Sequence, residues 1–268
     1  MIRRIPAFLR KDFLVEKSYR FAFLLGIFST LFSLLIFFFI DRLFGREVAP
    51  YLEELKINYF SYVFVATLLF NYTGAGLGSI SEKIRTEKVQ GTFEGIANNE
   101  GILPPFVVSV IIYNFALTSL ETVLYLAAGF FFLGLDFSNV NLLSLALTLF
   151  LSVLSFSSIG IVSSCFIILF RKGNPLAFLL NSMEGLFGGV YFPVAVLPLW
   201  AQFVSKLLPV YYAINAAQKS FYLNASPAQI WKELAALALF SAVLFPFSLW
   251  LLKKSVDRSR LKGTLGRY

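Results

Sequence analysis

Six long runs of apolar residues, separated by charged or proline-containing segments, dominate this sequence. A helix needs about 20 mostly apolar residues to cross a lipid bilayer, and in lipid it satisfies its backbone hydrogen bonds internally. Runs of roughly that length cover residues 21–40, 59–80, 105–133, 142–170, 175–192 and 234–252. The sequence therefore predicts an all-α, polytopic membrane protein with six transmembrane helices, arranged as a single transmembrane domain over residues 1–268.

The composition agrees with this class and excludes several others. Hydrophobic residues make up 58% of the chain and charged residues 14%, with a mean hydropathy of +0.76, whereas a soluble domain is about 45–50% apolar and about 25% charged. The chain has no His and one Cys. Imidazole catalysis, Ser-His-Asp triads, thiolate metal clusters and disulfide frameworks are therefore excluded, and we expect no metal site.

The 23 Lys and Arg residues predict the orientation. If the N-terminus is cytoplasmic, the segments on that side carry 17 of them, as the positive-inside rule requires. We therefore expect both termini in the cytoplasm and the chain in the cell membrane. Topology and anionic lipid headgroups then explain the net charge of +8, so no nucleic-acid partner is expected.

Residues 2–20 predict an amphipathic helix ahead of the first apolar run. Ile5, Phe8, Leu9 and Phe13 recur at spacings that place them on one face. Such a helix is expected to lie along the headgroups with its apolar stripe toward the membrane.

The segment between the second and third runs, residues 81–104, predicts two helices joined by a turn. Gly91 can end the first of them in a left-handed conformation. Thr92 is placed to cap a second, short helix, with Glu94 in its first turn. A short helix parallel to the membrane has no core of its own, so it would serve to dock on a cytoplasmic partner. A solvated loop is the alternative.

Three prolines, Pro193, Pro198 and Pro209, interrupt the apolar segment between the fifth and sixth runs. The stretch 198–209 is apolar enough to enter the bilayer but too short to cross it, and proline breaks helices. The pattern predicts a re-entrant hairpin, which is tolerated at membrane depth when it packs against protein or lines a cavity. An interfacial loop with a few aromatic residues is the alternative.

Two motifs, in this order, resemble those of the permease subunits of type-2 ABC transporters, most of which are exporters. Residues 87–94, Glu-Lys-Val-Gln-Gly-Thr-Phe-Glu, resemble the family's GT-x-E stretch ahead of the third span. Residues 189–198, followed by Pro209, resemble its late signature G-x-x-x-P-x-x-x-x-P…P. The six-run layout with an amphipathic N-terminal helix matches across the whole chain. One departure is Lys219, which stands in a region where the family often has Arg.

The resemblance implies a role for each segment. Residues 91–100 would form a coupling helix that docks on an ATPase, residues 2–20 an interface helix beside it, and residues 193–222 re-entrant helices at the outer end of the pathway. The implied coupling residues are Glu87, Gly91, Thr92, Phe93 and Glu94. The implied gating residues are Gly189, Phe192, Pro193, Pro198 and Pro209.

Partners and cofactors follow from the same resemblance. Two permease chains, as a homodimer or a heterodimer, would assemble in membrane lipid with two cytoplasmic ABC ATPase subunits. The sequence contains no G-x-x-x-x-G-K-[ST] phosphate loop. We therefore expect no enzyme activity and no cofactor in this chain, with ATP and Mg²⁺ on the partner ATPase. The implied activity is export of a hydrophobic or amphipathic substrate, such as a drug, a lipid or a lipid-linked glycan.

Two carboxylates, Glu121 and Glu184, lie within the apolar runs. A carboxylate inside a membrane is costly, so each is a candidate for contact with substrate or for stabilising the gating hairpin. A hydrogen bond between helices, or a protonated acid, is the structural alternative.

Two other classes of function compete with an ABC permease. An ion-coupled secondary transporter often has inverted repeats, and no clear repeat relates the halves of this chain. An intramembrane enzyme such as a lipid transferase would need several carboxylates at a membrane edge to hold a metal, and only Glu121 and Glu184 are embedded, far apart in sequence.

Overall fold

The computed structural model describes residues 4–18, 20–55, 57–99, 101–135, 139–170 and 175–262. The described part of the chain is 85% helical and contains no strand. In chain order the elements are α1 (Ile5–Ser18), α2 (Arg20–Val48), η2 (Ala49–Tyr51), η3 (Glu53–Leu55), α3 (Tyr59–Val89), α4 (Phe93–Asn98), α5 (Leu103–Leu133), α6 (Leu142–Phe170), α7 (Pro175–Phe187), η4 (Val194–Val196), α8 (Leu199–Ser205), α9 (Pro209–Tyr222) and α10 (Trp231–Leu261). The predicted all-α class is confirmed.

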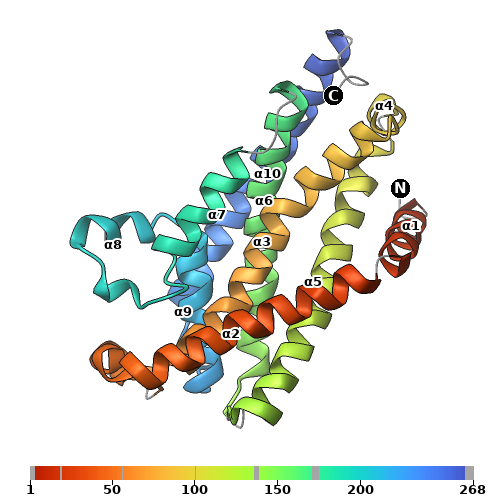
Figure 1. The fold of residues 1–268 in the computed structure, drawn as a ribbon. Helices are drawn as coiled ribbons and strands as arrows, with labels where there is room; N and C mark the ends of the chain where they lie inside the picture. The colour runs from red at the N-terminus through yellow and green to blue at the C-terminus, as the bar shows by residue number, and fades with distance from the viewer. Residues whose placement is uncertain are drawn as a thin grey trace.

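Helix α3 is the central helix of a bundle of long helices (Figure 1). It packs against α2, α5, α6 and α9, while α10 packs mainly along α6. In the most apolar part of each helix, 67% of the residues of α3 are buried, against 22% for α5 and 17% for α10. The outer faces of α5 and α10 therefore remain open to lipid.

The crossing of α3 and α6 is a direct contact between two helix backbones. A Cβ atom on Gly160 would overlap the carbonyl group of Gly76, and one on Gly76 would overlap the backbone of Phe156. Just beyond the crossing, the Ser81 hydroxyl donates to the Gly160 carbonyl oxygen at 3.3 Å. Small residues allow this close approach, from which membrane helices gain van der Waals contact.

Serine side chains join α6 to α10. The hydroxyl oxygens of Ser155 and Ser241 lie 2.9 Å apart, and Ser241 also donates to the Leu151 carbonyl oxygen at 3.1 Å. Ser241, Ser248 and Ser255 recur every seventh residue of α10 and are all buried. Their spacing keeps them on one helix face, where small polar residues allow tight packing.

Among the described residues, four helices are long and apolar enough to cross a membrane, namely α3, α5, α6 and α10. The helices α5 and α6 contain the predicted spans 105–133 and 142–170. The helix α2 has 29 residues and extends beyond the predicted span 21–40. The count of six spans stays a prediction.

The predicted span 175–192 is longer than the helix found there. The described part of α7 has 13 residues and ends at Phe187, a length of about 20 Å, whereas the hydrocarbon core is about 30 Å thick. The cause is a turn at Gly189, which has a φ of +84°. Residues 171–174, ahead of α7, lie outside the described residues.

The Gly160→Ala substitution is expected to lower the unfolding midpoint in detergent, because its methyl group must push α3 and α6 apart; overpacking of this kind costs about 1–3 kcal/mol. Gly78→Ala is the matched control, since a Cβ atom at Gly78 meets nothing within 4 Å. Alanine stabilises a helix by up to about 1 kcal/mol relative to glycine, so the midpoint of this variant should not fall. Equal midpoints for the two variants would contradict the close crossing.

Candidate functional site

A tight turn joins the end of α3 to α4. Helix α3 ends at Val89, and Gly91 adopts a φ of +73°. The backbone amides of Gly91 and Thr92 donate to the carbonyl oxygens of Lys88 and Glu87 at 3.1 and 2.9 Å. The turn expected at Gly91 is therefore confirmed, and it reverses the chain so that α4 lies across the end of the bundle, near the end of α10 (Figure 1).

Helix α4 is anchored on one side and exposed on the other. Phe93, Ile96 and Ala97 are buried in a cluster formed by the ends of α3, α5, α6 and α10. Glu94 and Asn98 are exposed on the opposite side. The segment is thus a packed helix and not a solvated loop. It is shorter than the predicted 91–100, and residue 100 lies outside the described residues.

Thr92 occupies the predicted N-cap position of α4, but its side chain makes no capping hydrogen bond. Its backbone is helical, with φ −88° and ψ −20°, and its side chain caps no amide of α4. An N-cap side chain reaches the helix amides from an extended backbone. The Thr92 hydroxyl instead bonds back to α3, where it contacts the carboxylate of Glu87 and lies 3.2 Å from the Glu87 carbonyl oxygen.

Glu87 is the centre of an ionic network that ties α1 to α3 and to α4. Its side chain is 1% exposed and pairs with Lys11 of α1 as well as with Thr92. A second ion pair joins Asp12 of α1 to Lys83 of α3. Charge-assisted hydrogen bonds of this kind are about twice as strong as neutral ones. Two parallel clamps therefore hold α1 against the end of α3 that carries α4.

The residues of the predicted apolar stripe of α1 have different surroundings. Phe8 packs edge-on against Phe106 of α5, with ring centroids 5.6 Å apart. Asp12 is buried one turn later, whereas Phe13 is 60% exposed. The side chain of Asp12 turns inward because Lys83 neutralises it, and Phe13 is left to face the surroundings of the helix.

The C-terminal part of α10 also holds α4. Arg260 donates to the carbonyl oxygen of Ala97 and pairs with Asp257 at 3.1 Å. Ala97 lies in the last turn of α4, whose final carbonyl groups have no partner within the helix. The sequence analysis did not identify Arg260, because its contact with Ala97 joins residues 163 positions apart. No local sequence pattern indicates such a contact.

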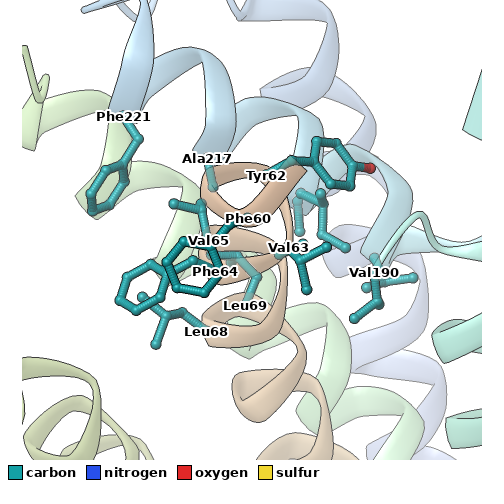
Figure 2. Close-up of a cluster of buried hydrophobic side chains, with 14 of the residues drawn as sticks. Phe60, Tyr62, Val63, Phe64, Val65, Leu68, Leu69, Val190, Ala217 and Phe221 are labelled. Atoms are coloured by element: carbon teal, nitrogen blue, oxygen red, sulfur yellow. The ribbon is translucent and has the colours of Figure 1, made fainter. Parts of the chain in front are cut away.

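The opposite end of α3 holds the segment that follows α7 (Figure 2). The Tyr62 hydroxyl donates to the Gly189 carbonyl oxygen at 2.6 Å, and the Tyr59 hydroxyl to that of Tyr191 at 2.8 Å. Phe192 also presents its carbonyl oxygen to Tyr62, at 3.4 Å. The chain entering the proline-rich segment is thus fixed to α3 by buried tyrosines.

The three prolines begin short helical elements, as predicted. Pro193 and Pro198 precede η4 and α8, and Pro209 begins α9. Helix α8 lies at the side of the bundle (Figure 1) and exposes Leu199 and Trp200. Its entry into the bilayer as part of a re-entrant hairpin stays a prediction.

A small cavity of about 190 Å³ lies between this segment and the helix bundle, and its lining includes Tyr62, Pro193, Gln218 and Lys219. Gln218 is buried and donates to the Tyr62 carbonyl oxygen at 3.3 Å. Lys219, in the region where the resemblance expects Arg, pairs with Glu233 of α10 at 2.6 Å. The cation is therefore retained at this end of the bundle, and its charge is balanced by a carboxylate.

The two embedded carboxylates lie on different helices. Glu184 of α7 is 1% exposed and lies beside Thr73 of α3, and its Oε2 atom has no hydrogen-bond partner among the described residues. Glu121 of α5 is half-buried. No group of three Asp, Glu or Cys side chains in the described part of the chain could hold a metal ion. A part for either carboxylate in transport stays a prediction.

Long apolar helices, a short helix packed across one end and a proline-broken segment fixed at the other make this a polytopic membrane protein. The chain belongs to the ABC-2 type transporter family, whose model matches residues 4–222. It is therefore a permease subunit that works with an ABC ATPase, and ATP hydrolysis belongs to that separate subunit. Comparison with curated proteins gave no match.

The Glu87→Gln substitution is expected to loosen the attachment of α1, because it removes the charge that pairs with Lys11. A buried amide then replaces the carboxylate in its hydrogen bonds, which is expected to destabilise the packing of α1 by about 1–3 kcal/mol. Amide hydrogen exchange over residues 5–18 should then be at least several-fold faster. Glu82→Gln is the control, since Glu82 is exposed and its partner among the described residues is Arg85, one turn away on α3. Unchanged hydrogen exchange over residues 5–18 in Glu87→Gln would contradict the inference that the Lys11–Glu87 pair holds α1 in place.

The Tyr62→Phe substitution is expected to release the segment after α7, because the buried carbonyl oxygen of Gly189 loses its donor, at a cost of about 1–3 kcal/mol. Hydrogen exchange over residues 188–198 should accelerate. Tyr51→Phe is the control, since Tyr51 is 51% exposed. The attachment is disproved if exchange in Tyr62→Phe matches that of the control.

Proposed function

We propose that this chain is the permease of an ATP-driven exporter that moves a hydrophobic or amphipathic substrate out of the cytoplasm or the inner leaflet. The observation that carries the proposal is α4, a helix packed on one face and exposed on the other at one end of the bundle. We assign that end to the cytoplasm, with both termini on the same side, because the excess of Lys and Arg favours it.

The exposed side of α4 is proposed as the surface on which the ATPase docks. Val89 is 65% exposed beside the turn, and Glu94 and Asn98 face outward from α4 itself. The buried side is held by Phe93 and by the bond from Arg260 to the last turn. A helix held in this way moves with its neighbours when it is pushed, as a coupling helix must.

Helix α3 provides a mechanical connection between the two ends. Glu87 anchors α1 and α4 near its C-terminus, and Tyr62 anchors the proline-broken segment near its N-terminus. The two residues are 25 positions apart, or about 38 Å along a helix. Closure of the ATPase dimer would displace α4, tilt α3 and so shift the segment 193–222, which we propose as the outer gate of the pathway.

The assembly would contain two copies of the ATPase, which bind ATP and Mg²⁺, and a second permease chain. The gate would be formed by the residues around Gly189 and the three prolines. The cavity beside Gln218 would open or close as the segment moves. The exposed apolar side chains of α8 suit a substrate that is itself apolar in part.

The Glu94→Lys substitution is expected to weaken ATPase binding by tenfold or more, since it reverses a charge at the centre of the proposed surface. Co-purification with the partner ATPase and ATP-driven transport in vesicles are the readouts. Glu53→Lys, an equal charge change in η3 at the opposite end of α3, should leave both unchanged.

Two outcomes would overturn the proposal. The first is normal ATPase binding by Glu94→Lys, which would place the docking surface elsewhere. The second is transport that continues without ATP and collapses when the proton or sodium gradient is removed, which is the behaviour of an ion-coupled secondary transporter.

A further inference from the structure

A groove between α5 and α10 lies at the α4 end of the bundle and outside the proposed docking surface. It has a volume of about 310 Å³ and is lined mostly by apolar side chains. Leu103 and Val107 come from the start of α5, and Leu249, Leu252 and Val256 from α10. The volume is at the lower end of the range for small-molecule sites, about 300–1,000 Å³.

The groove crosses the boundary between apolar and charged sequence. Its α10 residues, from Leu249 to Arg260, follow the three- and four-residue spacing of one helix face. The apolar part of α10 ends at Leu252, and Lys253, the next residue, also lines the groove. The groove-lining face of α10 therefore carries apolar side chains up to this boundary and a lysine directly after it.

Lys253 is the lysine in the lining of this groove. It is exposed and forms no ion pair among the described residues. Asp257, also in the lining, is paired with Arg260. The ammonium group of the neighbouring Lys254 lies 4.8 Å from the centre of the Trp250 ring and takes no part in the lining.

We propose that this groove binds a phospholipid with an anionic headgroup. One acyl chain lies between Leu249 of α10 and Val107 of α5, and the headgroup phosphate lies on Lys253. The occupant is a lipid because the outer faces of α5 and α10 are open to the bilayer, so it can enter sideways. It is anionic because residues 253–262 carry five basic side chains and one acidic one.

The proposal is tested by titrating delipidated permease in detergent with phosphatidylglycerol or phosphatidylcholine and counting bound lipids by native mass spectrometry. Phosphatidylglycerol should bind more tightly. Lys253→Gln should weaken its binding about fivefold, the effect of removing one Lys charge near an anionic lipid. Lys254→Gln, which removes the same charge one residue away, should have less than a twofold effect.

A second pair of variants tests the apolar part of the groove. Leu249→Trp should fill it and reduce phosphatidylglycerol binding, whereas Leu239→Trp, on an exposed part of α10 outside the groove, should not. Equal binding of the two lipids, equal effects of the two Lys variants, or full binding by Leu249→Trp would each overturn the proposal. Loss of ATPase binding in Leu249→Trp with lipid binding intact would assign the groove to the ATPase instead.

Discussion

The close crossing of α3 and α6 is the contact on which the other features of this bundle depend. Gly76 and Gly160 bring the two backbones together, and lipid cannot compete for a surface on which two helices match so closely. Helix α3 is buried as a result, with neighbours on several sides. Its two ends are then held in defined positions, one beside α4 and the other beside the segment that follows α7.

Polar groups are used differently at the ends and along the length of the bundle. Charged side chains pair at the α4 end, where Glu87 and Asp12 are buried against lysines. Within the apolar helices, serine hydroxyls bond to carbonyl groups of their own helix or of a close neighbour, as Ser220 and Ser155 do. The difference reflects cost, because an unpaired charge in lipid is far more unfavourable than a satisfied hydroxyl.

Local features of the fold were predicted well, and features that depend on neighbours were not. The apolar runs located α5 and α6, Gly91 marked a turn, and the prolines marked the breaks around α8. The side chain of Thr92 makes no capping hydrogen bond, and the helix within the predicted span 175–192 ends at Phe187. The Thr92 hydroxyl bonds to the carboxylate of Glu87 instead, a contact that depends on how the turn folds back on α3.

The sequence by itself determined which segments are apolar enough for the membrane, where glycine and proline interrupt them, and the family to which they belong, since these depend on composition, spacing and motif. Only the tertiary structure decided that Arg260 holds Ala97, that Tyr62 holds Gly189 and that α5 and α10 leave a groove between them. Helical periodicity indicates which face of a helix is apolar. It carries no information on which distant helix that face meets, because many pairings bury a similar area.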